Sequence, residues 1–176
     1  STGRTVIDGK ERIMLCANNY LSMSNHPKVK QAAIDAVKSH GAGSGSVRPI
    51  AGNMDIHNEL EETIARFKNR EAALYYQTGF AVNSGLIPQL AGKNDAIISD
   101  QLNHGSIIDG VRLSGVKKEN RTIYAHNDMG ELEDRLKEAT NKCEKTLVIS
   151  DGVVSMDGDI APLDEITNLA REYGAM

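Results

Sequence analysis

A repeated alternation of short apolar runs with longer helix-like segments constrains the fold of this chain more than any other feature. Four apolar or β-branched runs are each followed by a segment able to form a helix. The runs are Ala72–Tyr76, Ala96–Ser99, Thr122–Ala125 and Thr146–Ile149, and the segments are Val82–Leu90, Ile107–Leu113, Glu131–Ala139 and Leu163–Tyr173. A spacing of about 25 residues is typical of successive βα units, and runs without polar alternation suit strands buried on both faces. The sequence therefore predicts an α/β fold with a mainly parallel sheet covered by helices.

The first fifty residues follow a different pattern. Thr5–Ile7 and Arg12–Leu15 flank Asp8-Gly9, a pair that suits the tight turn of a β-hairpin. A helix is expected to begin at Pro27 and to stop at Gly41, before a glycine-rich passage. A second helix follows, and its apolar face consists of Ile56, Leu60, Ile64 and Phe67. We divide the chain into residues 1–50, which hold the hairpin, helix and glycine-rich segment, and residues 51–176. Because no linker separates them, both are read as parts of one α/β domain.

The composition is that of a soluble globular protein, and it argues against several classes of function. The 176 residues are 40% hydrophobic and 25% charged, which is enough for one well-cored domain. The formal net charge is −4 and the basic residues are not gathered on one stretch, so no nucleic-acid partner is expected. No apolar run approaches the roughly 18 residues of a membrane span, and no signal-like segment opens the chain. We expect no association with a membrane.

Neither the cysteines nor the histidines are spaced as metal ligands. Cys16 and Cys143 are far apart and form no CxxC motif, so neither a zinc site nor a disulfide framework is indicated. None of the five histidines forms an HxxxH pair or lies at ligand spacing from a cysteine. We therefore expect no metal, and a reducing, cytoplasmic setting.

Polar residues follow several of the predicted strands, where α/β proteins place their chemistry. Thr78-Gly79-Phe80 opens a helix, so its backbone N–H groups could hold a phosphate, although ordinary strand–helix turns have the same composition. His104, after the strand that ends at Asp100, could stack on a planar ligand or act as a general base. Taken alone, His104 is better explained as a loop histidine satisfied by its neighbours.

Two further loops leave similar alternatives open. Asp151 and Ser155 belong to an acidic loop after the strand Leu147–Ile149, which could line a polar pocket while Asp157-Gly158 forms a tight turn. The spacing of its acids does not match a calcium loop. The amides of Asn18 and Asn19 could bind a carboxylate or carbonyl of a substrate, or could cap the turn before the helix at Pro27.

As an ordered set, these motifs resemble a known family. The motifs are Cys16–Leu21, Ser46-Val47-Arg48, Ala51-Gly52, His57-x-x-Leu60-Glu61, Thr78-Gly79-Phe80-x-x-Asn83, Ser99-Asp100-x-x-Asn103-His104-x-Ser106-Ile107-x-Asp109-Gly110 and Asp151-Gly152-Val153-x-Ser155-Met156-Asp157-Gly158-Asp159. They resemble the α-oxoamine synthases, pyridoxal-phosphate enzymes with the fold of aspartate aminotransferase. The resemblance runs from about Thr5 to the end of the chain, and its two longest motifs are highly specific. It implies that residues 51–176 are the first part of a cofactor-binding large domain.

Within that family, three segments resemble the glycine C-acetyltransferases most closely. The segments are Cys16–Leu21, Ile97–Leu113 and Asn127–Glu133. The resemblance implies condensation of glycine with acetyl-CoA to 2-amino-3-oxobutyrate and coenzyme A, in a homodimer. The 8-amino-7-oxononanoate synthases, which join alanine to a pimeloyl thioester with loss of the carboxyl group, are a near second.

The resemblance also implies roles for the strand-end residues in binding pyridoxal 5'-phosphate. The backbone of Gly79 and Phe80 would bind the cofactor phosphate, with assistance from Thr78. Ser155 would form a hydrogen bond with the cofactor, and Asp151 would line the pocket.

His104 and Asn18 are the residues that the resemblance places nearest the substrate. His104 would lie over the pyridine ring and help to polarise or position the acyl carbonyl, and Asn18 would contact the amino acid. The chain departs from the family pattern at Ser22, Gly105 and Val154, where Gly, Ala and Phe are usual. None of these changes removes a polar group.

Two essential groups of the family are not expected within this chain. The lysine that holds the cofactor covalently, and the carboxylate that keeps its ring protonated, lie after the position of Met176 in the family pattern. No lysine here has the family's Ser/Thr-Lys context. We therefore expect an internal piece of a longer enzyme. The alternatives are a non-catalytic α/β module that binds a ligand, and a structural subdomain whose parallel sheet exposes an unpaired edge.

Overall fold

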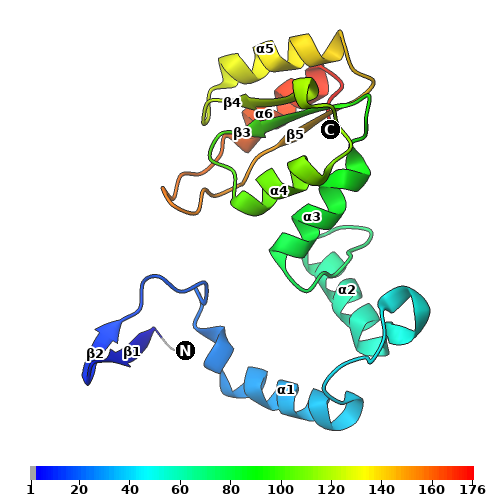
Figure 1. Cartoon of the computed structure of the whole chain (residues 1–176). Helices are drawn as coiled ribbons and strands as arrows, with labels where there is room; N and C mark the ends of the chain where they lie inside the picture. The colour runs from blue at the N-terminus through cyan, green and yellow to red at the C-terminus, as the bar shows by residue number, and fades with distance from the viewer. Residues whose placement is uncertain (1–2) are drawn as a thin grey trace. The chain divides into compact units, whose positions relative to one another are not determined.

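The computed structural model describes residues 3–176, and its internal contacts divide the chain into two compact units. The first unit is Ser1–Tyr75 and the second is Tyr76–Met176. Figure 1 labels their helices and strands. The boundary expected after residue 50 falls inside the first unit and stays a prediction.

The first unit begins with the hairpin that the sequence predicts. Strands β1 (Arg4–Ile7) and β2 (Lys10–Ile13) pair antiparallel. Asp8 and Gly9 both have left-handed backbone, with φ of 51° and 71°, as the mirror-image turns of hairpins require. A short helix η1 (Met23–Asn25) follows.

Two helices complete the first unit. Helix α1 (Pro27–His40) begins and ends where the sequence predicts, and Gly41 ends it with a φ of 80°. A single π-helical turn, η2 (Arg48–Gly52), precedes helix α2 (Asp55–Phe67).

The strand predicted over Ala72–Tyr76 is wrong, because no strand of the described structure pairs with this segment. Its backbone bonds to a side chain instead: the N–H of Tyr75 donates to Oε1 of Glu61 at 2.8 Å. Glu61 also accepts from the Arg48 guanidinium, at 3.0 Å between Nη2 and Oε2. These two hydrogen bonds, the one from Arg48 first, lower the pKa of Glu61 to about 2. The apolar run therefore lies outside both sheets of the described structure.

The second unit contains a parallel sheet in the strand order β4-β3-β5, which confirms the predicted fold class. Central β3 (Ala96–Asp100) is buried at every position, and β4 (Arg121–Tyr124) and β5 (Thr146–Ile149) flank it. A short helix η3 (Lys118–Asn120) leads into β4. On the outer side of β5, Met176 accepts from the Val148 N–H at 2.8 Å and donates to the Thr146 carbonyl at 2.9 Å.

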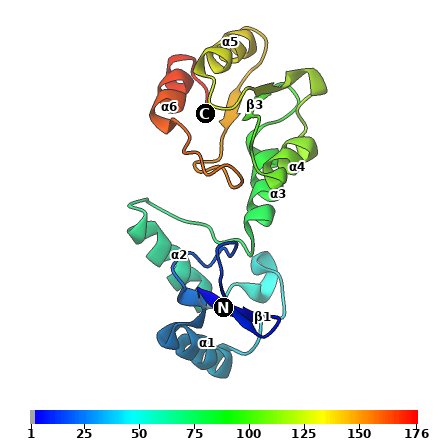
Figure 2. The ribbon, with the colours of Figure 1, turned by 90° about the vertical axis from the view of Figure 1, so that its left-hand side faces the viewer.

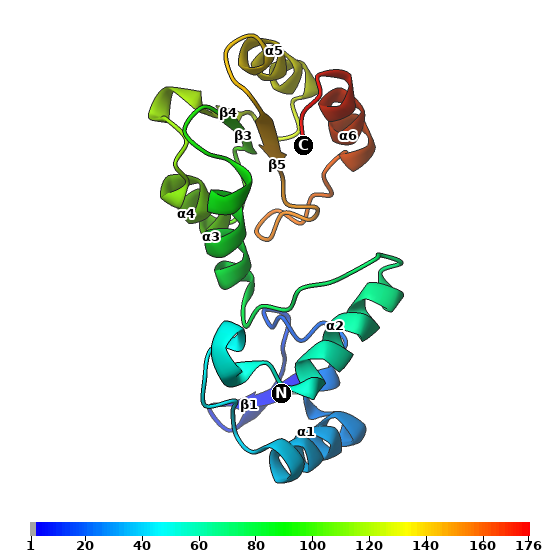
Figure 3. The same cartoon turned by 90° about the vertical axis from the view of Figure 1, so that its right-hand side faces the viewer.

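Helices cover both faces of this sheet, as Figure 3 shows. Successive residues of β3 point to opposite faces, so Ile97 packs in the core beneath α3 (Gly79–Leu90) and α4 (Gly105–Leu113). Ile98 packs in the second core, beneath α5 (Met129–Thr140) and α6 (Leu163–Glu172). In the part of the chain that the structure describes, no helix is long and apolar enough to cross a membrane.

Candidate functional site

The carboxyl ends of β3 and β5 are joined by one buried amide, that of Asn103. Its Nδ2 donates to Ser99 Oγ at 2.9 Å and to the Ile149 carbonyl at 2.8 Å. Its Oδ1 accepts from the Asp151 N–H at 2.7 Å. Asn103 is only 6% exposed, so these partners replace the water that its amide loses. The amide therefore fixes the two strand-end loops against each other.

This junction brings together two of the residues that the sequence selects. One carboxylate oxygen of Asp151 accepts from the His104 N–H at 2.7 Å. His104 comes from the loop after β3 and Asp151 from the loop after β5, so their proximity depends on the parallel pairing of the two strands. His104 also caps α4 as its N-terminal flanking residue.

The ring of His104 is oriented by hydrogen bonds to its Nδ1. The Ser106 N–H donates to Nδ1 at 3.1 Å, and the Ser106 hydroxyl lies 2.7 Å from the same nitrogen. Asn83 Nδ2 donates to that hydroxyl oxygen at 2.9 Å, which leaves the hydroxyl proton for His104. Nδ1 therefore accepts, and in the neutral imidazole the proton resides on Nε2. The same chain of bonds links α3, through Asn83, to the start of α4.

The N-terminus of α3 offers unused hydrogen-bond donors. Thr78 caps the helix, and its Oγ1 accepts from the Ala81 N–H at 3.0 Å. Among residues 3–176, no group accepts from the N–H of Gly79 or Phe80. A Cβ built on Gly79 would meet nothing within 4 Å, so the space beside this backbone is open. Free N–H groups at the positive end of a helix dipole suit a phosphate, as the sequence predicts for this turn.

Ser155 lies in a small hairpin between β5 and α6. Figure 2 shows this segment as the orange loop that precedes α6. Val153 and Ile160 form an isolated antiparallel bridge at its base. Gly158 has a φ of 80° and donates its N–H to the Val154 carbonyl at 2.9 Å, so the tight turn predicted at Asp157-Gly158 is confirmed. Ser155 is exposed in this hairpin, and its role toward a cofactor stays a prediction.

Asn18 belongs to the first unit and is exposed in the segment between β2 and η1. The neighbouring amide, Asn19, accepts from the Ser24 N–H at 3.1 Å, which is a turn-forming role of the kind left open for this pair. The proposed contact between Asn18 and a substrate stays a prediction.

The sequence gives no role to His126, although it lies in the loop after β4. Its Nδ1 lies 2.9 Å from the carboxylate of Asp100, whose side chain is 1% exposed. Burial alone would raise the pKa of Asp100, but hydrogen bonds from the Leu102 N–H and from His126 outweigh burial and lower it. A histidine 26 residues away along the chain carries no local signal of this contact.

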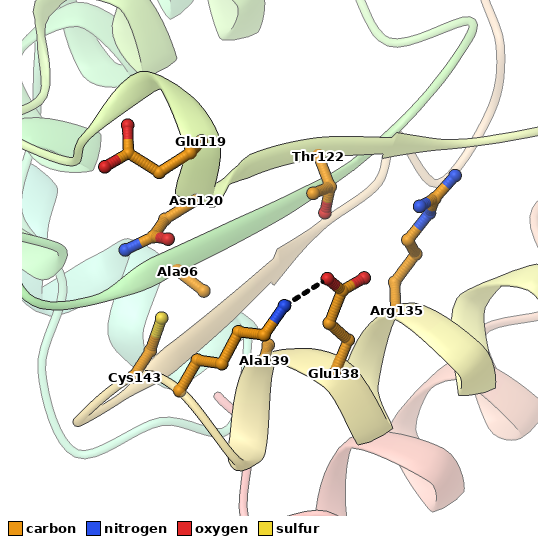
Figure 4. A pocket seen from close by; sticks show the side chains of 9 residues that line it. Ala96, Glu119, Asn120, Thr122, Arg135, Glu138, Ala139 and Cys143 are labelled. Carbon is orange, nitrogen blue, oxygen red and sulfur yellow. Dashed lines mark hydrogen bonds and ion pairs between the residues drawn. The ribbon is translucent and has the colours of Figure 1, made fainter.

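A separate pocket of about 130 Å³ lies at the opposite end of the strands (Figure 4). Its lining includes Ala96 and Thr122, near the starts of β3 and β4, and the Lys142–Glu138 ion pair that the dashed line marks. Ligands of α/β sheets bind at the carboxyl ends, so this pocket is not the candidate site. Within residues 3–176, no group of three His, Cys, Asp or Glu side chains is placed to hold a metal ion.

Comparison with known proteins decides the family. Residues 10–176 match the family model described as aminotransferase class I and II. The chain belongs to this family. An 8-amino-7-oxononanoate synthase of Alkaliphilus metalliredigens is 55% identical over 171 residues, 97% of the chain and 42% of that protein. The synthase of Treponema denticola is 53% identical and is matched over 100% of the chain and 44% of its own length.

Solved structures agree with the aminotransferase class I and II assignment. Serine palmitoyltransferase of Sphingomonas wittichii superposes with a TM-score of 0.93 at 34% identity, over 99% of the chain and 43% of its own. An 8-amino-7-oxononanoate synthase of Francisella tularensis gives 0.72 at 28% identity, over 87% of the chain and 41% of its own. The chain thus spans less than half of each relative. The relatives' names favour the 8-amino-7-oxononanoate synthases over the glycine C-acetyltransferases that the motifs placed first.

Enzymes of this aminotransferase family depend on pyridoxal phosphate, and the residues present fit that group. A phosphate needs donors without other partners, and the N–H groups of Gly79 and Phe80 are such donors. A planar cofactor ring can stack on a flat side chain of fixed orientation. The imidazole of His104 is such a group, because it is exposed and its orientation is fixed by Ser106.

Removal of the Thr78 hydroxyl tests the N-terminal cap of helix α3. We expect Thr78→Ala to lower the free energy of unfolding by about 1 kcal/mol, because the Ala81 N–H loses its acceptor. Thr78→Ser keeps the oxygen and should retain most of the stability. Urea denaturation of both variants is the measurement, and equal losses in the two would contradict the capping role.

Proposed function

We propose that this chain is part of a pyridoxal-phosphate-dependent α-oxoamine synthase, which joins an amino acid to the acyl group of a thioester. The observation that carries the proposal is one hydrogen-bond network in the second unit. It runs from Asn103 and Asp151 through His104 and Ser106 to Asn83 on α3, and so connects three elements around the candidate cofactor site.

The residues of the candidate site have separate tasks. The cofactor, when bound, supplies an electron-accepting ring that stabilises negative charge on the Cα of the amino acid. The N–H groups of Gly79 and Phe80 bind its phosphate, and Thr78 supports them by capping α3. His104 covers the ring. With Nδ1 occupied by Ser106, the Nε2–H of His104 is the donor left to polarise the acyl carbonyl.

The first candidate reaction is that of 8-amino-7-oxononanoate synthase. Relatives with that name are 48% to 55% identical to this chain. In this reaction alanine condenses with a pimeloyl thioester, and carbon dioxide and the thiol leave. The second candidate is glycine with acetyl-CoA, which the segments Cys16–Leu21 and Asn127–Glu133 favour by resemblance. We further propose a cytoplasmic homodimer, as the family resemblance implies.

Thiol release by the full-length protein tests the reaction. We expect release with a small amino acid and an acyl-CoA in the presence of pyridoxal phosphate, faster with alanine and pimeloyl-CoA than with glycine and acetyl-CoA. The reverse order would select the second candidate. No release with either pair would contradict the proposal. His104→Ala should lower the rate about a hundredfold, the usual size of one acid–base or positioning contribution.

Chemical labelling separates this proposal from a non-catalytic binding module. Borohydride reduction of the full-length protein with pyridoxal phosphate should fix one cofactor per chain on a lysine outside residues 1–176. Peptide mapping by mass spectrometry locates the label. Stoichiometric labelling of a single lysine within residues 1–176 would overturn our assignment of residues. Absence of any specific label would favour the binding module.

A further inference from the structure

His126 connects the loops that follow all three strands of the sheet. It belongs to the loop after β4, and its Nδ1 lies 2.9 Å from Asp100 Oδ1 at the end of β3. Its Nε2 lies 3.5 Å from Asp159 Oδ2, in the loop between β5 and α6. The His126 side chain is only 16% exposed, so the two contacts are not those of a freely moving surface residue.

The charges around this imidazole favour its protonated form. Asp100 is held ionised by the Leu102 N–H at 2.8 Å and the Asn127 N–H at 3.2 Å, in addition to His126. The hydrogen bond to Asp100 raises the pKa of His126 against the opposing effect of burial, and the charge of Asp159 adds to it.

Other ionisable groups near His126 are engaged elsewhere. Asp128 caps α5 by accepting the Glu131 N–H, and the Glu131 carboxylate accepts the Ala125 N–H. The Tyr124 phenol is fully buried, and burial together with the charge of Asp100 raises its pKa to about 12. Tyr124 is therefore neutral wherever His126 titrates. The groups that face the ring and carry charge are Asp100 and Asp159.

The amide of Asn127 lies beside the ring of His126. Its Nδ2 lies 3.0 Å from His126 Nε2, an arrangement that suits a neutral ring accepting at Nε2. Its Oδ1 is buried and, within residues 3–176, has no hydrogen-bond partner. Rotation of the amide by 180° would exchange its two ends and place Oδ1 at Nε2, where a protonated ring donates. The amide can therefore serve either charge state.

Asp159 links His126 to the hairpin that carries Ser155. Its carbonyl accepts from the Val154 N–H at 2.8 Å, and the Ala161 N–H donates to the Gly152 carbonyl at 3.1 Å. The Asp159 side chain is 56% exposed, and its Oδ2 contacts the His126 ring. Loss of that partner frees one arm of the hairpin.

We propose that His126, in its charged form, is a positioning residue that ties hairpin 152–160 to the end of β3 and so holds Ser155 toward the cofactor site. The consequence for the cofactor rests on the function proposed above, whereas the tie itself does not. Because the pKa of His126 is raised on folding, its stabilisation is fully present below the ordinary value of 6.5. It is lost as the pH rises through the folded pKa.

Hydrogen exchange of the cofactor-free, full-length protein tests the tie. We expect protection factors of the Val154, Gly158 and Ala161 amides to fall about two- to fivefold between about pH 6 and pH 9, the size of one partly exposed ion pair. In His126→Gln and Asp159→Asn, these amides should have at every pH the lower protection factors that the parent protein shows near pH 9. His40→Gln removes a comparable histidine–aspartate pair in the first unit and should behave as the parent protein.

The proposal would be overturned if the protection factors of the parent protein did not change between about pH 6 and pH 9. It would also be overturned if Asp159→Asn had the same pH profile as the parent protein. Titration of pyridoxal phosphate gives a second readout: between about pH 6 and pH 9 its dissociation constant should rise more steeply in the parent protein than in His126→Gln. If the dissociation constants of the parent protein and of His126→Gln changed in parallel with pH, His126 would have no effect on cofactor binding through this tie. A protein that binds no pyridoxal phosphate at any pH contradicts the proposed function, while hydrogen exchange still decides the tie.

Discussion

Replacing Asn103 with alanine should lower the free energy of unfolding by about 2–4 kcal/mol, because three polar groups around one buried amide lose a hydrogen bond at once. The Asp151 N–H is left without its acceptor, and the Ile149 carbonyl and the Ser99 hydroxyl each lose a donor. Urea denaturation of the cofactor-free, full-length protein measures the loss. We also expect pyridoxal phosphate to bind more weakly, because the loop that presents His104 is no longer fixed against the loop after β5.

Asn141→Ala is the matched control for this prediction. Asn141 is exposed at the end of α5, and its Nδ2 donates to the Lys137 carbonyl at 2.9 Å. Water replaces that bond, so the change should cost at most about 0.5 kcal/mol. Similar losses in Asn103→Ala and Asn141→Ala would show that the junction between the loops does not depend on the buried amide.

A methyl group added at Gly110 should lower the free energy of unfolding by about 3 kcal/mol through overpacking. Gly110 lies on α4 where the helix contacts α3, and it is buried. A Cβ there would overlap the Asn83 carbonyl oxygen and lie 2.8 Å from Ile87 Cδ1. Because Asn83 also donates to Ser106, the displacement should reach the hydrogen bonds that orient His104. Gly110→Ala is therefore expected to weaken cofactor binding as well as stability.

Gly105→Ala tests whether the effect is specific to that contact. Gly105 is the first residue of the same helix, and a Cβ built on it meets nothing within 4 Å. Alanine also has the higher helix propensity, so this variant should be as stable as the parent or gain up to about 1 kcal/mol. A Gly110→Ala variant as stable as Gly105→Ala would show that α3 and α4 can separate without cost.

Local signals along the chain predicted most secondary elements of the second unit. The strand predicted over Thr146–Ile149 has those bounds in β5, and the segment Leu163–Tyr173 differs from α6 by one residue. These elements follow from periodicity and from neighbouring turn residues, which are properties of adjacent positions. The hairpin turn at Asp8-Gly9 is predictable for the same reason, since the backbone conformation of the pair is set locally.

The run Ala72–Tyr76 shows where local signals fail. Its composition is that of a strand, yet a strand exists only beside another strand, and in the described structure the Tyr75 N–H donates to Glu61 instead. Likewise, Asn103 and Asp151 are 48 positions apart, and nothing near either residue indicates that they bond.

By itself, then, the sequence determined which residues stand after each strand, the helical and extended character of most segments, and a motif order that resembles one family. Only the tertiary structure decided which of these residues meet. Parallel pairing of β3 with β4 and β5 places the three strand-end loops together, so that Asn103 joins His104 to Asp151 and His126 joins Asp100 to Asp159. These contacts depend on strand register and burial, which arise from packing between distant segments and leave no trace in local composition.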